Sequence, residues 1–144
     1  MEEVLNKLKE FHLVYGHPIE SEPTTQTNEL AELRYKLGKE ELAEYLEANR
    51  NDDPVEVADA LADQLYILLG TMLAHGMQNV IVEVFDEVHR SNMSKLGEDG
   101  KPIKREDGKI LKGPNYFKPD LGKIINKEWE RKRVQLEIPF DEKV

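Results

Sequence analysis

Acidic side chains are concentrated in the middle of this chain of 144 residues. Residues 40–63 contain nine acids and one base, so this window carries −8 of a net charge of −9. Carboxylates held close together repel one another, and a hard cation such as Mg²⁺, which prefers oxygen ligands, relieves that repulsion. The window therefore predicts a divalent-metal site that can hold a phosphate-bearing ligand. Its acids are Glu40, Glu41, Glu44, Glu47, Asp52, Asp53, Glu56, Asp59 and Asp63.

The first group of acids falls on a helix expected from about residue 27 or 28 to residue 48. Leucines spaced three and four apart mark the inward stripe of this helix. At about 100° per residue Glu41 and Glu44 continue that stripe, and Glu40 lies at its edge. Acids on a face that begins with leucines are not the usual solvated pattern, so these three are candidates for chemistry.

The second group falls on a helix expected over residues 54–75. Asp53 and Pro54 form a typical helix start, and Gly76 a typical stop. Glu56, Asp59 and Asp63 share one face, which continues into apolar positions. For Glu56 there is also a purely structural interpretation, because it stands at the acid position of a capping box. For Glu47, Asp52 and Asp53 we expect surface or capping roles.

The remaining elements complete an all-α prediction. We expect helices over residues 2–15 and about 79–91, and a last one from about 120 to 133 with Trp129 on its apolar side. Two Asp-Gly turns predict a short hairpin pairing residues 103–105 with 109–111. The predicted fold is a four-helix bundle with a small β-hairpin and a C-terminal arm. It forms a single domain over 1–144, with a helical core to about residue 96 and the hairpin and arm over about 97–144.

Composition excludes several classes of function. The chain has no cysteine, which rules out disulfides, thiolate metal sites and a cysteine nucleophile. A protein this acidic repels nucleic acid and anionic membranes, so neither is expected as a partner. No apolar run reaches the length of a membrane span, and we expect a cytoplasmic protein.

Histidine spacing argues against a di-iron bundle. That site needs Glu-x-x-His on two helices, and among the four histidines only His89 has an acid, Asp86, three residues before it. The other histidines are interpreted as packing or loop residues. Beyond His89, Asn92 and Lys95 continue the apolar stripe of their helix if it extends that far, which would point them inward toward a phosphate or base. The simpler alternative is an ordinary helix C-terminus.

The motifs together resemble a known superfamily. Glu40-Glu41-Leu42-Ala43-Glu44, followed by the run from Asp59 to Tyr66, resembles the all-α, MazG-like nucleoside triphosphate pyrophosphohydrolases, whose hallmark is Glu-x-x-Glu on one helix and Glu-x-x-Asp on the next. The chain is most similar to the phosphoribosyl-ATP pyrophosphohydrolase-like branch over roughly residues 8–122. The matching segments are Phe11-His12, Leu33-Arg34, Gly70-Thr71 and 88–95, together with Asp107-Gly108-Lys109 and Pro119-Asp120-Leu121.

The resemblance implies a Mg²⁺-dependent enzyme that cleaves a nucleoside triphosphate or related nucleotide to the monophosphate and pyrophosphate, with Mn²⁺ as a substitute metal. It also implies a homodimer or a dimer-based homotetramer. Glu40 or Glu41 would accept the proton of the attacking water. The implied metal ligands are Glu41, Glu44, Glu56, Asp59 and Asp63, and the implied substrate contacts are Arg34, Asn92 and Lys95.

One motif departs from the family pattern. Glu56 and Asp59 have the superfamily spacing, but Asp63 better matches the acid that precedes the apolar half of the helix, and Ala60 then takes the place of its glutamate. Two alternatives from other classes also stay open. One is a non-catalytic module that binds nucleotide or metal. The other is a helical oligomerisation protein whose acids pair with Arg and Lys across an interface.

Overall fold

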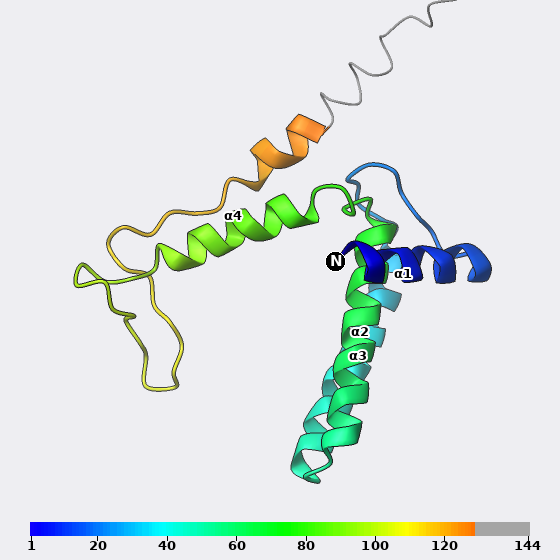
Figure 1. Cartoon of the computed structure of the whole chain (residues 1–144), viewed down its shortest axis with the longest axis horizontal. Coiled ribbons are helices and arrows are strands. Elements are labelled where there is room, and N and C mark those ends of the chain that lie inside the picture. Colours follow the sequence, from blue (N-terminus) through cyan, green and yellow to red (C-terminus); the bar gives the residue numbers. More distant parts are fainter. Residues whose placement is uncertain (129–144) are drawn as a thin grey trace, which may run out of the picture. The chain divides into compact units, whose positions relative to one another are not determined.

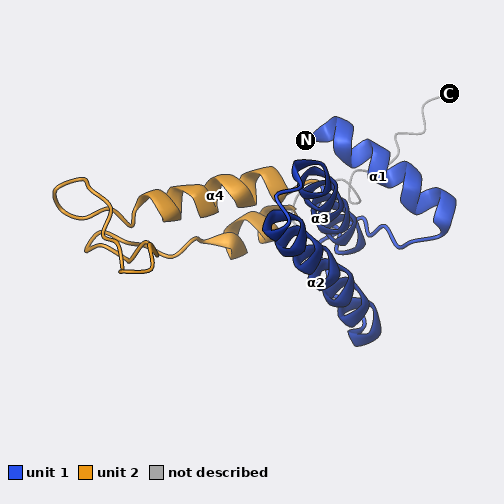
Figure 2. Ribbon diagram, turned by 90° about the horizontal axis from the view of Figure 1, so that it is seen from below, with its two compact units in different colours: residues 1–78 blue, residues 79–144 orange. Residues whose placement is uncertain are grey.

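The structure is a computed structural model that describes residues 1–128. The chain divides into two compact units, residues 1–78 and 79–144 (Figure 2), and each is described by itself. The long helices of the first unit are α1 (Glu2–Tyr15), α2 (Asn28–Arg50) and α3 (Pro54–Ala74), and the second unit begins with the shorter α4 (Ile81–Met93). Residues 121–128 are also helical. The all-α prediction is therefore confirmed for the described residues.

The first unit is organised by α2 and α3, which lie side by side (Figure 1). Only residues 51–53 separate the two helices, so they must run antiparallel. As a consequence, the second half of α2 faces the first half of α3. Because the acids of residues 40–63 occupy those two halves, the hairpin brings the acids of α2 close to those of α3.

Capping residues fix where this hairpin turns. The side chain of Asp53 accepts hydrogen bonds from the backbone N–H groups of Val55 and Glu56, at 3.0 and 3.1 Å, and Pro54 begins α3. Asp52 adopts a left-handed conformation with φ of 52°, which reverses the chain direction. The start predicted for this helix is confirmed, and its end falls one residue before the predicted one.

The hydrophobic core lies between α1 and the second half of α3. Leu5 and Leu8 of α1 pack against Leu69 and Leu73 of α3, and all four are buried. These leucines recur at three- and four-residue spacing on each helix, as an amphipathic face requires. The core therefore sits at the end of the hairpin that is remote from its turn, and leaves the acidic end without an apolar cover.

The loop between α1 and α2 is held against the end of α3. The Gln78 side chain donates to the Glu20 backbone carbonyl at 2.7 Å, and the His75 ring bonds the Thr24 carbonyl at 2.8 Å. Gly76 has φ of 67°, and a Cβ on it would lie 2.0 Å from the backbone of Glu22. Only glycine fits here, so the end of α3 and the loop are fixed together.

The second unit is organised around the end of α4. Ser91 is buried, and its hydroxyl donates to the Phe117 carbonyl at 2.8 Å. Ser94 closes the same connection, because its hydroxyl accepts from the Phe117 N–H at 3.2 Å. The guanidinium of Arg90 lies 4.3 Å from the centre of the Phe117 ring. These contacts give the serines of residues 91–94 a structural role.

The predicted β-hairpin is reduced to isolated bridges. Lys104 pairs with Ile110, in the predicted register, and Leu96 with Pro102, but no β-strand forms within residues 1–128. Single bridges of this kind lack the cross-strand side-chain pairs that stabilise a sheet.

The bounds of two helices also differ from the prediction. The helix α4 begins at residue 81 rather than 79. The predicted last helix is present over 121–128, and Trp129 lies outside the described residues.

The four predicted helices are divided between the two units. Only α1, α2 and α3 belong to the first unit, while α4 belongs to the second. By length and composition α3 is apolar enough to cross a membrane. However, it packs against both α1 and α2 and carries acids in its first half, so we interpret it as the central helix of the first unit.

Candidate active site

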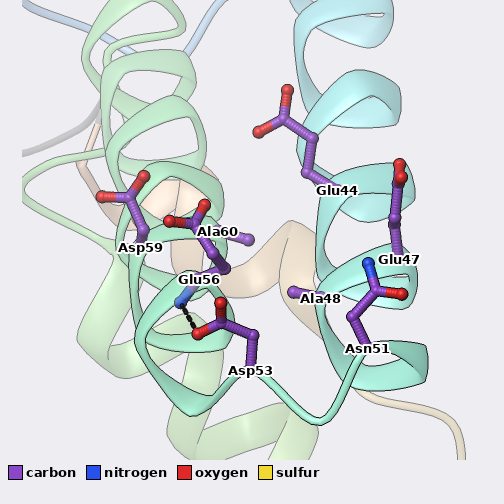
Figure 3. A pocket seen from close by; sticks show the side chains of 8 residues that line it. All are labelled: Glu44, Glu47, Ala48, Asn51, Asp53, Glu56, Asp59 and Ala60. Atoms are coloured by element: carbon purple, nitrogen blue, oxygen red, sulfur yellow. Dashed lines mark hydrogen bonds between the residues drawn. The ribbon is translucent and has the colours of Figure 1, made fainter.

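A cleft of about 250 Å³ opens between α2 and α3 near the turn of the hairpin (Figure 3). Two buried alanines, Ala48 and Ala60, line it from the two helices, and their small side chains leave space for the acids around them. Longer polar side chains form the rest of the lining: Glu44, Glu47, Asn51, Asp53, Glu56 and Asp59. With five carboxylates and no basic residue on its walls, the cleft is suited to a cation.

Glu41 is the acid most affected by its surroundings. It is half-buried, and its Oε2 atom is fully buried without a hydrogen-bond partner. Burial raises the pKa of Glu41, and the neighbouring charges of Glu44, Asp63, Glu40 and Asp59 raise it further, in that order. Acids from both helices therefore act on one carboxylate, which the spacing of the sequence predicts.

The exposure of the other acids differs from the prediction. Glu40, Glu44, Glu56, Asp59 and Asp63 are exposed in the single chain. The stripes on which they lie were expected to face inward, but of this group only Glu41 is even half-buried. The physical reason is that the acidic end of the hairpin packs against no third helix of its own unit.

The capping-box interpretation of Glu56 is not supported. In a capping box its side chain would accept from the backbone N–H of Asp53. That N–H instead donates to the Ala48 carbonyl at 3.1 Å. Asp53 alone caps the helix. The Glu56 carboxylate is therefore not committed to the helix start, and it lines the cleft.

Sequence reasoning missed two parts of the cleft. Glu47 is exposed, as expected, but it also lines the cleft, and Asn51, which was not singled out, lines it too. The signal was their spacing: Glu44, Glu47 and Asn51 recur at i, i+3 and i+7, which places them on one face of a helix. The Asn51 amide adds an oxygen that can ligate a hard cation.

The donor set was tested against a divalent metal. It fits in chemical type, because carboxylate and amide oxygens are the ligands that Mg²⁺ prefers, and Glu41 has a buried oxygen without a partner. In distance the side chains are spread: within residues 1–128 no three His, Asp or Glu side chains are gathered closely enough to hold one ion.

The three predicted substrate contacts lie in different places. Arg34 is half-buried on α2, in the first unit. Asn92 and Lys95 belong to the second unit, where the Lys95 ammonium donates to the Asn92 side-chain oxygen at 2.7 Å. Asn92 lies in the last turn of α4 and is exposed in that unit, which differs from the prediction that its stripe points inward.

Comparison with known proteins adds independent information. A crystal structure from Exiguobacterium sp. 255-15, described provisionally as an NTP pyrophosphohydrolase, matches 88% of this chain and 96% of its own, with a TM-score of 0.52 and 24% sequence identity. At that identity the match supports the fold alone. A search of curated proteins finds no match.

A family model gives the more specific result. The model described as phosphoribosyl-ATP pyrophosphohydrolase matches residues 8–92. This span includes the second half of α1 and all of α2 and α3, and therefore every candidate acid, and it ends at Asn92. The chain belongs to the phosphoribosyl-ATP pyrophosphohydrolase family.

Proposed function

We propose that the chain is a Mg²⁺-dependent nucleotide pyrophosphohydrolase that cleaves a nucleoside triphosphate, or a related nucleotide, to the monophosphate and pyrophosphate. The observation that carries this proposal is the gathering of carboxylates from both α2 and α3 around one cleft. Burial first, and then the neighbouring acids of both helices, raise the pKa of Glu41. Family membership supports the same reaction class.

The acids have separate roles in this proposal. The metal would be held by the carboxylates of Glu41, Glu44, Glu56, Asp59 and Asp63. When bound, Mg²⁺ neutralises phosphate charge and lowers the pKa of a coordinated water, as in other metal-assisted phosphoryl transfers. Mn²⁺ has the same preference for oxygen ligands and would substitute.

Glu41 and Glu40 are the candidates for the general base. Burial makes the Glu41 carboxylate more basic than an exposed one, so it is the better proton acceptor when the water attacks. Glu40 is exposed next to it and would take the proton if Glu41 is fully engaged with the metal. Arg34, Lys95 and Asn92 would contact the substrate as donors to its phosphate, sugar or base.

A homodimer, or a tetramer built from dimers, is part of the same proposal. Leu61, Leu65 and Leu68 recur at helical spacing on α3, and each is about half exposed. Leu65 and Leu68 border an apolar groove of about 680 Å³ between α2 and α3, together with exposed Leu42 and Tyr35. Apolar surface of this extent on one helix pair is typical of a protein–protein contact. A second copy that covers the groove would bury it.

The direct test is to incubate the full-length protein with individual nucleotides and Mg²⁺ and to measure pyrophosphate release. Glu44→Gln and Asp63→Asn should abolish turnover while the far-UV circular dichroism spectrum stays unchanged. Glu32→Gln is the matched control, because Glu32 is exposed on α2 outside the cleft. Activity that survives in both site variants would refute the site assignment.

Two other results would favour the alternatives. Nucleotide binding without any product would indicate a non-catalytic binding module. If Glu44→Gln changes the oligomeric state, and no nucleotide is hydrolysed by the wild type, the acids belong to an assembly interface. Size-exclusion chromatography with light scattering distinguishes this case.

A further inference from the structure

A second, more enclosed pocket lies within the first unit, where α1, α2 and α3 meet. Its volume is about 180 Å³, and its walls are mostly apolar. Phe11 is the centre of an aromatic cluster on these walls: it stacks on His17 with a centroid distance of 5.7 Å and meets Tyr66 edge to face at 5.3 Å. Phe11 is half-buried, and Tyr66 and His17 are exposed, so the cluster is not sealed inside the core. Such walls suit a planar ring.

One charged side chain shares this pocket. Arg34 lines it, and within residues 1–128 its guanidinium has no hydrogen bond and no ion pair. Its Nε–H is fully buried without an acceptor. Burial lowers the pKa of Arg34, but a guanidinium stays protonated at neutral pH. A buried donor without a partner is costly and rare in folded proteins. The terminal N–H groups of the same guanidinium are not fully buried, so these are the donors that a ligand in the pocket can reach.

The position of this guanidinium depends on His12 and Gly70. The Nδ1–H of buried His12 donates to the Pro18 carbonyl at 2.9 Å, which leaves the lone pair on its Nε2 atom. A Cβ built on Gly70 would lie 2.9 Å from that Nε2 and 3.0 Å from the Nη1 atom of Arg34. The missing side chain at residue 70 thus makes room for both groups. Gly70 is therefore a positioning residue for Arg34, and His12 occupies the space beside it.

The pocket lies next to the acids along both helices. Arg34 precedes Glu41 by seven residues on α2, which is two helical turns or about 10 Å. Tyr66 follows Asp63 by three residues on α3, which is nearly one turn. Because seven- and three-residue separations keep residues on the same face, the pocket and the acid cluster share one side of the hairpin. A single nucleotide can then reach both.

We propose that this pocket receives the base of the nucleotide, with its ring against Phe11 and Tyr66 and its exocyclic carbonyl oxygen accepting from Arg34. The inference rests on the proposed function for the phosphate end of the ligand. Guanidinium donors pair well with a carbonyl oxygen, and with the O6 and N7 atoms of guanine in particular. Adenine has no carbonyl oxygen. The substrate class is therefore nucleotides of uracil, thymine, cytosine or guanine rather than those of adenine.

The first experiment needs no catalysis. Uridine, thymidine, cytidine, guanosine and adenosine are titrated into the full-length protein, and the aromatic NMR signals of Phe11 and Tyr66 are followed. We expect the carbonyl-bearing nucleosides to bind at least about tenfold more tightly than adenosine, the size of one good guanidinium contact. If no nucleoside shifts these signals, or if adenosine binds best, the inference is wrong.

Arg34 variants test the contact itself. Arg34→Met keeps much of the length and loses the donors, so the preference against adenosine should disappear. Arg34→Lys keeps the charge without the planar fork and should restore only part of it. Arg50→Met is the matched control, since Arg50 is exposed in the last turn of α2, and it should behave as wild type. Thermal melting verifies that each variant is folded.

A kinetic comparison separates this inference from the proposed function. For dUTP, dTTP, dCTP, dGTP and dATP, Arg34→Met should lower kcat/KM for the carbonyl-bearing substrates and leave dATP nearly unchanged. An equal loss for every base would mean that Arg34 acts on the phosphates, which overturns the inference. If nucleosides bind as expected but no nucleotide is hydrolysed, the proposed function fails while the base pocket stands.

Discussion

Two glycines in the middle of helices provide a matched pair of perturbations. Gly70 lies on α3 and Gly38 on α2, and replacing either by alanine should gain about 0.5–1 kcal/mol from helix propensity. At Gly38 the new Cβ meets only the Ile67 side chain at 3.9 Å, an ordinary contact. At Gly70 it would lie 2.9 Å from His12 Nε2. The two variants therefore differ in packing and share the propensity term.

The cost at Gly70 follows from how firmly its neighbours are held. Arg34 is a flexible side chain whose end can move away, but His12 is 1% exposed and bonded to Pro18. Overpacking in such a site costs about 1–3 kcal/mol, which exceeds the propensity gain. We expect Gly38→Ala to raise the free energy of unfolding by up to about 1 kcal/mol, and Gly70→Ala to leave it unchanged or lower it by up to about 2 kcal/mol.

Urea unfolding and thermal melting measure this difference. For a chain of this length 1 kcal/mol corresponds to roughly 3 °C in Tm, so the variants should melt about 3–9 °C apart. Unchanged m-values would show that the unfolded state is not responsible. Light scattering verifies that both variants have the wild-type assembly state. If both glycine variants are stabilised equally, the close approach of His12 to Gly70 is refuted, and with it the positioning of Arg34.

Three further predictions concern other parts of the chain. Burial, and then the charges of Arg34 and His17, hold the pKa of His12 below its usual 6.5, although the bond to Pro18 opposes this. As the pH falls, the unfolded chain binds this proton before the folded chain does, so the free energy of unfolding should be complete above pH 6.5 and decrease below it. The slope should reach up to about 1.4 kcal/mol per pH unit in the wild type and be absent in His12→Asn. Equal slopes for the two proteins, measured by urea unfolding at several pH values, would contradict the assignment. Without Mg²⁺, Asp63→Asn should raise Tm, because it relieves repulsion among the acids. Saturating Mg²⁺ should stabilise the wild type, by about 2.7 kcal/mol in the free energy of unfolding at 100 times Kd, but not this variant. If differential scanning fluorimetry shows the same Mg²⁺ effect in the variant, Asp63 is not a ligand. Leu65→Glu should shift the mass measured by light scattering to that of a monomer, because it places a charge in the apolar groove; an unchanged mass would place any interface elsewhere.

Much of the fold was predictable from local signals in the sequence. Thr27, Asp53 and Pro54 are strong helix-start residues, and the structure uses all three in that way. Gly16 and Gly76 both take a left-handed conformation at or just after the helix ends. Such signals act within a few residues and need no tertiary contact. The prediction of a β-hairpin at 103–111 was only partly right, because strands depend on partners beyond the local sequence. Two short segments with few cross-strand partners do not form stable strands.

The amino-acid sequence by itself determined which acids belong together. The spacing places Glu41 and Glu44 on one face of the first helix, and Asp59 and Asp63 on one face of the second. Because only three residues separate the two helices, they pack side by side. The tertiary structure decided how these acids differ. Only Glu41 is withdrawn from water, because exposure depends on what the neighbouring helix covers, which periodicity alone does not contain.

The pocket around Arg34 shows the same limit more clearly. Its residues come from three helices, and no single stretch of sequence marks Phe11, Tyr66 and Arg34 as neighbours. In the sequence Gly70 is only a glycine within a helix. In the structure, the absence of a side chain at Gly70 leaves the space that His12 and Arg34 occupy. Helix faces follow from local geometry, and the sequence determined them. Which faces meet, and what remains unpaired between them, depends on packing between distant segments, and only the tertiary structure decided it.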